Sequence, residues 1–406
     1  MTAKNFGKMI CMLRNKSGLT QKDLSEKLNI SDKAVSKWET GLAFPDITHL
    51  PILAELFGVS TDYMLKCNIK GIAIAGSIIT DIVNIIDKYP QKNMLANVLS
   101  SNKTVGGCVP NVAIDLAKLD SNIYLSVFGK VGNDENGKFL ISQLQGFGID
   151  VRGIQISEDK PTSFANVMTE CKTGERTFFS AKGANADFGI SDIDIDALNC
   201  EIFHIGYVCL LDRLDKSDSA YGTVLARLLH SIQEKGIKTS IDAISDDVEG
   251  YSGKMIPVLK YCNYVIVNEI ESSLVTGLSP RNSDGTLNIK NIKKTMQKFI
   301  EYGVKDKVII HCSEAGFMMT SDGEFIIVPS LELPNEYIKG SVGAGDAYAA
   351  GCLYGIYHGY ENERILEFAS CAAAANLSAV DAVSGMKNIE KVNLLKNQFK
   401  RGTLYD

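Results

Sequence analysis

A glycine-rich stretch near the C-terminal end of the chain combines the features of an anion-binding turn with an acidic residue. It reads Gly340-Ser341-Val342-Gly343-Ala344-Gly345-Asp346 and precedes a helix of small residues expected over 347–358. Glycines let successive backbone N–H groups converge on an anion, and the start of a helix adds roughly half a positive charge. A carboxylate there suits a base that takes a proton from a hydroxyl attacking a phosphoryl group. The alternative is a helix cap with flexible glycines; the spacing is not that of a P-loop.

The chain around this stretch alternates apolar runs with amphipathic segments. The runs predict strands at 71–75, 123–128, 202–205, 239–242, 264–267 and 308–311. The amphipathic segments predict helices at 113–119, 138–145, 221–235, 292–302 and 347–358. This alternation is typical of an α/β fold with a mainly parallel sheet covered by helices, in which ligands bind at the carboxyl ends of the strands.

One segment departs from that alternation. Residues 166–170 and 177–180, joined by a polar turn, predict a hairpin in the middle of the chain. Together with residues 82–105 it is expected to form a small β lid, roughly 82–105 and 162–180, over the main domain. Such a lid excludes water from a reacting phosphate.

Residues 70–395 resemble the ribokinase/PfkB family of carbohydrate kinases. The first family signature is matched by Gly106-Gly107-Cys108-Val109-Pro110-Asn111-Val112-Ala113 and by residues 128–137, and the second by the Gly340–Asp346 stretch. Between them, Asn268-Glu269-Ile270-Glu271 matches the family's N-x-x-E and residues 311–316 stand at a nucleotide-site position. Upstream, residues 76–81 resemble the strand end that supplies a sugar-binding aspartate. The resemblance implies a ribokinase-like fold and an ATP- and Mg²⁺-dependent kinase.

The resemblance also implies a role for each matched residue. Asp346 is the implied catalytic base, with the backbone of Gly343, Ala344 and Gly345 as the anion hole. The implied substrate-binding residues are Asp81, Gly106, Gly107 and Asn111. The residues implied near the nucleotide are Asn268, Glu271, Ser313, Gly316, Ser341 and Asn376, with Asn268 and Glu271 organising Mg²⁺ through water. Structural alternatives stay open: Asn111 as a helix cap, Glu271 as a solvated helix residue and Asp81 as a turn aspartate.

The chain departs from the family pattern at two positions. Gly340-Ser341 stands where the second signature usually begins with Asp-Thr, which argues against a monovalent-cation site that some relatives build nearby. Ile79 stands where ribokinases have a polar sugar-contacting residue, which argues against ribose as the substrate. Asp346 and its glycines are intact, so we expect an active enzyme.

The first 66 residues predict a separate, all-helical unit. Thr20 is expected to cap a helix over 21–28 with Asp23 as the capping-box acid, and Ser31 to cap a second helix over 32–40. A further helix is expected over 47–57, and Tyr63, Met64 and Leu65 close the unit. Two short helices separated by a three-residue turn have the layout of a helix-turn-helix.

Residues 5–66 resemble the Cro/lambda-repressor type of DNA-binding domain. By that resemblance the residues that face DNA are Gln21, Ser31, Asp32, Lys33, Ser36 and Lys37, with Gln21 near a phosphate. Trp38 would pack in the small core and Glu39 would tie helix to loop. The alternative is a helical dimerisation or protein-binding module.

Composition supports two different parts in one chain. The 406 residues carry a net charge of −6, so the whole molecule is not a polycation. Residues 1–40 hold eight Lys or Arg and four Asp or Glu, a local charge of +4. The length favours more than one domain, and we expect a DNA-binding domain over 1–66 and a kinase domain over 70–395, joined at 66–68.

Cysteine and hydropathy patterns favour a cytoplasmic protein. The ten Cys residues form no C-x-x-C pair and the five His residues are dispersed, so the sequence spells out neither a zinc site nor a redox dithiol. No signal peptide and no apolar run of the ~18–20 residues that span a bilayer is found, so no membrane partner is expected.

Two classes of function follow from the sequence. The first is a carbohydrate kinase that phosphorylates a sugar or sugar-like substrate, with a nucleoside kinase as the nearest enzymatic alternative. The second is a transcriptional regulator that binds double-stranded DNA and uses the kinase-like body as a sugar or nucleotide sensor. We expect a homodimer, because the resemblance to the ribokinase/PfkB family implies dimerisation through the lid and a DNA-binding domain of this type favours a two-fold partner.

Overall fold

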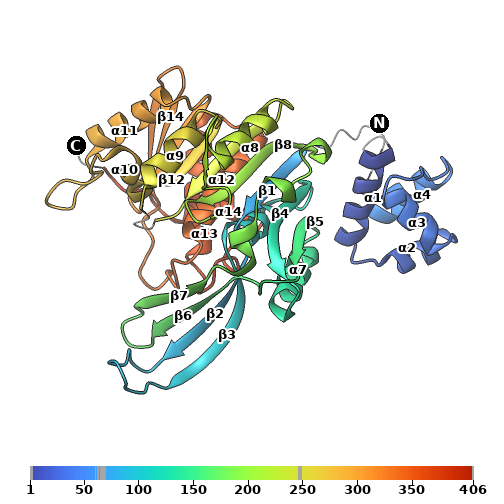
Figure 1. Cartoon of the computed structure of the whole chain (residues 1–406), viewed down its shortest axis with the longest axis horizontal. Helices are drawn as coiled ribbons and strands as arrows, with labels where there is room; N and C mark the ends of the chain where they lie inside the picture. The colour runs from blue at the N-terminus through green and yellow to red at the C-terminus, as the bar shows by residue number, and fades with distance from the viewer. Residues whose placement is uncertain (1–2, 60, 62–63, 65–69, 246–248, 405–406) are drawn as a thin grey trace.

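The computed structural model describes the chain apart from residues 1–2, 60, 62–63, 65–69, 246–248 and 405–406 (Figure 1). The expected linker at 66–68 and the closing residues Tyr63 and Leu65 lie outside the described residues. The chain forms a small helical unit, here called the head, followed by a larger α/β unit, here called the body.

The head consists of short helices around a core of its own. They are α1 (Ala3–Lys16), α2 (Gln21–Leu28), α3 (Asp32–Glu39) and α4 (His49–Phe57). The predicted caps are confirmed: the Thr20 side chain accepts from the Asp23 backbone N–H in a capping box, and the Ser31 side chain accepts from the Ala34 N–H. Phe6, Leu24 and Leu53 are fully buried, as is Met64.

A nine-stranded sheet forms the centre of the body. Its order is β15-β14-β13-β12-β11-β8-β1-β4-β5, parallel from β13 to β5 and antiparallel at β14 and β15. The strands are β1 (Gly71–Gly76), β4 (Leu125–Gly132), β5 (Asp150–Ser157), β8 (Cys200–Val208), β11 (Lys238–Ala243), β12 (Tyr264–Asn268), β13 (Lys307–His311), β14 (Ala315–Thr320) and β15 (Phe325–Pro329). The predicted α/β class with a mainly parallel sheet is confirmed.

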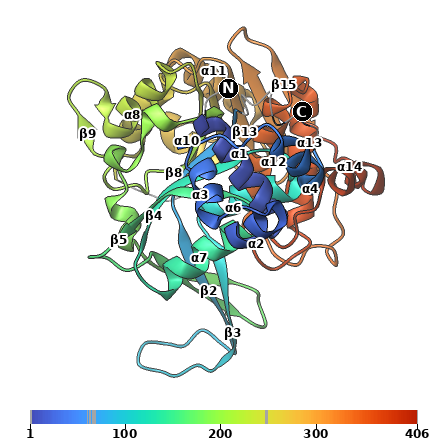
Figure 2. The same ribbon diagram turned by 90° about the vertical axis from the view of Figure 1, so that its right-hand side faces the viewer.

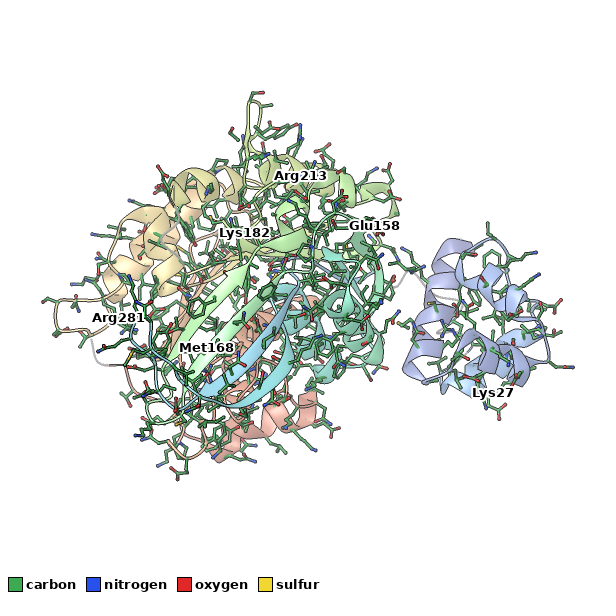
Figure 3. All side chains as sticks on the ribbon, turned by 60° about the horizontal axis from the view of Figure 1, so that its bottom comes forward. Lys27, Glu158, Met168, Lys182, Arg213 and Arg281 are labelled. Atoms are coloured by element: carbon green, nitrogen blue, oxygen red, sulfur yellow. The ribbon has the colours of Figure 1, made fainter. Side chains whose placement is uncertain are left out.

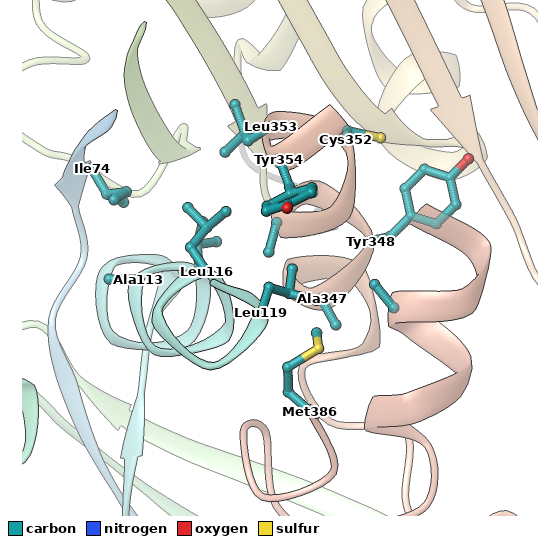
Figure 4. Close-up of a cluster of buried hydrophobic side chains, with 14 of the residues drawn as sticks. Ile74, Ala113, Leu116, Leu119, Ala347, Tyr348, Cys352, Leu353, Tyr354 and Met386 are labelled. Carbon is teal, nitrogen blue, oxygen red and sulfur yellow. The ribbon is translucent and has the colours of Figure 1, made fainter. Parts of the chain in front are cut away.

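Helices cover both faces of this sheet because successive strand residues point to opposite sides. In β1, Ile72 and Ile74 join one buried cluster and Ala73 and Ala75 the other. The first cluster includes residues of α6 (Cys108–Leu119), α7 (Glu135–Gly146), α12 (Ala344–Tyr357), α13 (Asn362–Asn376) and α14 (Ile389–Gln398). The second includes residues of α8 (Val224–Gln233), α9 (Tyr251–Leu259), α10 (Glu269–Thr276) and α11 (Ile289–Glu301). Figure 4 shows the first cluster, where Leu116 and Leu119 of α6 lie beside Ala347 and Tyr354 of α12.

A second, four-stranded sheet projects from the body as the lid. Its order is β3-β2-β6-β7, formed by β2 (Ile79–Ile86), β3 (Val98–Gly106), β6 (Phe164–Glu170) and β7 (Arg176–Ala181). The β2–β3 hairpin extends well away from the body in Figure 2. Short elements follow the lid: the 3-10 helices η1 (Gly183–Asp187), η2 (Ile190–Asp192) and η3 (Ile195–Ala197), then β9 (Ser217–Asp218) and β10 (Gly222–Thr223).

Several predicted boundaries were wrong by a few residues, and two of these matter for the site. Helices α6 and α12 begin at Cys108 and Ala344, earlier than the apolar periodicity indicated. Each begins directly after a glycine with positive φ, 85° at Gly107 and 76° at Gly343. The first turn of α12 holds small and polar residues, and that of α6 contains Pro110, so the apolar pattern does not mark either turn as helical. The earlier starts place Asn111 and Asp346 on helices.

The expected role of Glu39 was also wrong. Its carboxylate accepts from Arg14 Nε at 2.6 Å and from Gln21 Nε2 at 2.7 Å. Glu39 therefore ties α3 to the helices α1 and α2 and not to a loop. The side chains of Arg14 and Glu39 are only 11% and 5% exposed, so each charge depends on the other for compensation.

We expect Glu39→Ala to destabilise the head by about 3 kcal/mol, because it leaves the Arg14 guanidinium buried without its partner. Trp38 is the single tryptophan of the sequence and lies in the head core at 6% exposure. Urea unfolding followed by tryptophan fluorescence therefore reports on the head. The double variant Arg14→Met/Glu39→Met should lose less free energy of unfolding than Glu39→Ala, because it leaves no buried charge without a partner. If the unfolding midpoint of Glu39→Ala is no lower than that of the exposed-site control Glu26→Ala, the stabilising role of the Arg14–Glu39 pair is contradicted.

Candidate functional site

Two cavities meet at Asp346. The larger, of about 1010 Å³, lies between the lid and the body. The smaller, of about 660 Å³, lies over the ends of β11 and β12 and the start of α10. Both are lined by Tyr207, Gly343 and Asp346, together with Phe178 and Ser180 of the lid. A ligand in one cavity can therefore react with a ligand in the other at the Asp346 carboxylate.

The position of Asp346 follows from the turn before α12. Gly343 is the N-cap residue, and at its φ of 76° a Cβ would lie 2.6 Å from the Ala382 carbonyl oxygen, so only glycine fits. Asp346 thus lies in the first turn of α12. The first N–H groups of a helix have no partner within it and favour an anion. The Ala344 N–H makes a long 3.3 Å bond to the Ser341 carbonyl.

Two donors hold the Asp346 carboxylate in place. Its Oδ2 accepts from Asn111 Nδ2 at 2.9 Å and from Tyr207 Oη at 3.1 Å. Burial raises the pKa of Asp346 to about 7, and the nearby Asp242 carboxylate acts in the same direction. The hydrogen bonds from Asn111 and Tyr207 oppose that rise. The carboxyl group therefore titrates near neutral pH, where a general base works best.

A buried polar network lies behind Asp346, and the sequence analysis missed it. Asp242 accepts from the backbone N–H of Tyr207 and contacts His204 Nε2 at 3.1 Å. His204 is fully buried and its Nδ1 lies 3.0 Å from Ser240 Oγ. Tyr207 has a φ of 60°, which is unusual for a residue other than glycine. Asp242 ends a predicted strand, so the strand-end rule could have indicated it.

The larger cavity contains most of the predicted substrate residues. Asp81, Gly107 and Asn111 line it. Burial, and then the charge of Asp346, raises the pKa of Asp81 to about 7. Gly106 lies beside Asp81, because a Cβ at Gly106 would come 2.3 Å from Asp81 Oδ2. Glycine at this position allows the carboxylate to approach the backbone of β3.

Asn268 and Glu271 line the smaller cavity together with Asp242 and Ser245. Asn268 caps α10 by accepting from the Ile270 and Glu271 N–H groups, and Glu271 Oε2 accepts from the Asn268 N–H in return. Glu271 Oε1 accepts from Ser245 Oγ at 2.8 Å. Burial raises the pKa of Glu271 to about 8, so Glu271 is not the solvated helix residue of the alternative hypothesis.

The other predicted nucleotide residues are distributed differently. Ser341 lines the larger cavity. Ser313, Gly316 and Asn376 line neither cavity: the Ser313 hydroxyl donates to Glu314, and Asn376 is fully buried and donates to the Ala382 carbonyl. Gly316 faces the ring of Tyr348. A nucleotide role for these three residues stays a prediction.

The exposed face of α3 carries the predicted DNA-facing residues. Ser31, Asp32, Lys33 and Lys37 are exposed and Ser36 is half-buried, whereas Val35 and Trp38 face the head core. Gln21 lies at the start of α2, where its amide donates to Glu39. The face is therefore free to enter a groove, which a helix of the core could not do.

We expect Asp346→Asn to stabilise the free protein at pH 8 by on the order of 2–4 kcal/mol and to change stability little at pH 4. The folded-state pKa of Asp346 is raised, so the acid form favours folding, and this contribution is lost as the pH rises from about 4 to about 7. Urea unfolding by circular dichroism from pH 4 to 8 measures the difference. In the exposed-site control Asp159→Asn, the change in the free energy of unfolding should not increase in this way from pH 4 to 8. An equal increase in the two variants would refute the raised pKa of Asp346.

Comparisons with known proteins agree with this geometry. Residues 70–389 match the pfkB family of carbohydrate kinases, and residues 12–64 match a helix-turn-helix family. A 5-dehydro-2-deoxygluconokinase of Geobacillus thermodenitrificans is 25% identical over 315 residues, which cover 73% of this chain and 86% of that protein. A ribokinase of Schizosaccharomyces pombe is 24% identical over 306 residues, which cover 72% of this chain and 87% of that protein.

A solved structure shares the fold of the body. The crystal structure of a putative ribokinase II from E. coli in complex with ATP and Mg²⁺ superposes with a TM-score of 0.64 at 19% identity, covering 81% of this chain and 99% of that one. No helix in the described part of the chain has the length and hydropathy to cross a membrane. The chain belongs to the PfkB family of carbohydrate kinases and carries a helix-turn-helix domain ahead of its kinase domain.

Proposed function

We propose that this protein transfers the γ-phosphoryl group of ATP to a hydroxyl of a sugar or sugar-like substrate, with Asp346 as the base. The observation that carries the proposal is the place of Asp346, at the junction of two cavities and in the first turn of α12. The acceptor sugar would occupy the larger cavity and the nucleotide the smaller one. The names of the relatives, a sugar-acid kinase and a ribokinase, leave the sugar open.

The Asp346 carboxylate would accept the hydroxyl proton as the hydroxyl oxygen attacks the γ-phosphorus. The new P–O bond forms while the bond from the γ-phosphorus to the bridging oxygen breaks, and ADP leaves with that electron pair. A base that titrates near pH 7 takes up this proton and returns it to solvent without a large free-energy penalty. Asn111 and Tyr207 hold the carboxylate in one orientation throughout.

The start of α12 would bind the transferring group. The N–H groups of its first turn and the helix dipole favour the negative charge on the phosphoryl oxygens. A Cβ at Gly345 would lie 3.6 Å from His311 Cε1, so the glycine leaves the floor of the smaller cavity open beneath the phosphates. Asp81, Gly106 and Gly107 would hold the substrate hydroxyls from the other side.

The donors in the smaller cavity fit Mg²⁺, which prefers oxygen ligands and keeps several waters. Glu271 has a buried carboxylate with a pKa raised to about 8, so a cation nearby would stabilise its charged form. Asn268 already caps α10, which favours contact with the ion through water. Mg²⁺ bound there would neutralise charge on the nucleotide phosphates.

We expect Asp346→Asn to reduce turnover at least 10²-fold, because proton transfer loses its acceptor, while nucleotide affinity changes little. ADP release with Mg-ATP should be measured over hexoses, pentoses, keto-deoxy sugar acids and nucleosides, with nucleotide binding measured by calorimetry. Asp159→Asn serves as the exposed-site control. If the turnover of Asp346→Asn is within tenfold of that of the original protein, Asp346 is not the base. If nucleosides are the sole acceptors, the protein is a nucleoside kinase.

We further propose that the head binds double-stranded DNA in a sequence-specific manner through α3. Support comes from the exposed Lys33 and Lys37 beside the polar Ser31, Asp32 and Ser36. The second helix of such a motif lies in the major groove, where short polar side chains reach base edges and lysines reach phosphates.

We expect Lys33→Ala and Lys37→Ala each to weaken DNA binding about 5- to 100-fold. Lys27→Ala is the matched control, because Lys27 is an exposed lysine of α2 on the outer part of the head (Figure 3). The probes are duplexes selected from a random pool by the full chain and unselected duplexes, compared by fluorescence anisotropy at several salt concentrations. An equal loss of DNA affinity in all three variants would argue against the exposed face of α3 as the surface that contacts DNA. The same holds if the full chain shows no preference for the selected duplexes.

One contact favours a regulator in which the body senses ligand for the head. Lys8 Nζ of α1 donates to the Ala197 carbonyl of the body at 3.1 Å, and residues of α1 surround a small cavity together with Tyr124, Asp150 and Arg152. The anisotropy measurement is repeated in the presence of ADP and a sugar that the protein phosphorylates. It tests whether ligand binding in the body changes the affinity of the head for DNA. A change in affinity of at least threefold supports it, and unaltered affinity rejects it.

A further inference from the structure

The charged groups lining the larger cavity are distributed unevenly. Its acidic side chains are Asp81 and Asp346, which belong to the proposed phosphoryl-transfer machinery. The same cavity is lined by two cationic side chains, Arg176 from the lid and Lys339 from the loop before α12. The cations have no assigned part in phosphoryl transfer.

The lid register shows where Arg176 lies relative to Asp81. Asp81 pairs with Ala165, and Ala165 pairs with Ser180, which makes one row across the sheet. Arg176 pairs with Thr169 in a second row, four residues further along the strands, or about 13 Å at ~3.3 Å per residue. Residues an even number apart share a face, so both rows point into the cavity that they line.

Arg176 has no protein partner among the described residues. No hydrogen bond or ion pair is found for its guanidinium, and burial alone lowers its pKa. By contrast, several other cationic side chains of the body are paired: Arg152 with Asp150, Lys182 with Asp212 and Arg281 with Glu314. A partly buried guanidinium is costly unless an anion compensates it.

Thr169, directly opposite Arg176, also lacks a partner. Its Oγ1 is buried and makes no hydrogen bond within the described part of the chain. Met168, the preceding residue, belongs to the other face of the sheet, and Figure 3 labels it on the lid. Two neighbouring strands thus place a forked cationic donor beside a buried hydroxyl without a partner, on two residues that line the same part of the cavity.

We propose that Arg176 and Thr169 bind the carboxylate of a sugar acid, so that the natural substrate is an acidic sugar whose carboxylate lies opposite the phosphorylated hydroxyl. The planar guanidinium matches a carboxylate in bidentate fashion, and the Thr169 hydroxyl donates a third hydrogen bond. The inference rests on the proposed kinase function and names its substrate class.

The dimensions agree with this class of substrate. The arginine side chain spans part of the ~13 Å between the two rows. A six-carbon chain, with C–C bonds of about 1.5 Å, covers about 6–7 Å of the rest. Its hydroxyls would then face Asp81 and its terminal hydroxyl Asp346, while a neutral sugar would leave Arg176 uncompensated.

The test compares acidic and neutral acceptors in variants of Arg176. The probes are 2-keto-3-deoxygluconate and 5-dehydro-2-deoxygluconate as acids, fructose and ribose as neutral sugars, and fructose 6-phosphate as a phosphorylated sugar. The variants are Arg176→Met, which removes the charge, and Arg176→Lys, which keeps the charge without the fork. Lys172→Met removes an exposed charge from the turn of the same hairpin and is the matched control.

We expect an acid to be the preferred acceptor and its KM to rise about 10- to 100-fold in Arg176→Met, with a smaller rise in Arg176→Lys. The change in KM should exceed that in kcat and be at least tenfold greater for the acid than for fructose. Lys172→Met should behave like the original protein. Circular dichroism checks that Arg176→Met is folded.

The outcomes separate the inference from the proposed function. Turnover of neutral or phosphorylated sugars in preference to the acids would overturn the inference and leave the kinase proposal standing. Absence of turnover with every acceptor would count against the kinase proposal, and calorimetric binding of the same acids with ADP would then decide the inference. Binding of an acid that is lost in Arg176→Met supports the inference. No binding of either acid, or binding that Arg176→Met leaves unchanged, overturns the inference.

Discussion

The arrangement of the body depends on burying one carboxylate, Asp346, in the first turn of α12 without losing its ability to ionise. Burial and the Asp242 charge raise its pKa, whereas donors from Asn111 and Tyr207 lower it, and the balance lies at about 7. Each of these groups comes from a different element: Asn111 from α6, Tyr207 from β8 and Asp242 from β11. They meet because parallel strands present their carboxyl ends at one edge of the sheet.

The same carboxylate separates two environments with different chemistry. On the lid side, Asp81 and Asn111 suit hydroxyl groups, and on the other side Glu271, Asn268 and the start of α12 suit phosphates and a hydrated cation. Burial, and after it the like charges of neighbouring carboxylates, disfavours full ionisation of the site and raises the pKa of Asp81 and Asp346 to about 7 and that of Glu271 to about 8. A cation bound nearby would stabilise the charged forms of these carboxylates.

The head is built on a separate physical basis. Its core is formed almost entirely by its own helices, and a buried Arg14–Glu39 pair joins α1 to α3. On α3, Val35 and Trp38 face the core, whereas Ser31, Asp32, Lys33 and Lys37 are exposed, so the residues that stabilise the head and those available to a partner lie on opposite faces of one short helix. The body contributes Tyr124 to the same buried cluster, and Lys8 contacts the body, so a change in one unit has a direct physical path to the other.

Local patterns in the sequence determined the α/β class, the helix-turn-helix layout and the glycine-rich stretch that ends at Asp346, whereas Asp81, Asn111 and Glu271 followed only from the resemblance to a known family. Glycines with positive φ, helix caps and strand periodicity act over a few residues, so they can be read without the fold. The tertiary structure alone decided that Tyr207, Asp242 and His204 form a polar network behind Asp346, that Ser313, Gly316 and Asn376 lie outside both cavities, and that Arg176 lies opposite Thr169. Strand order, register and burial arise from contacts between distant segments, and it is these contacts that set the pKa values and leave a charge unpaired.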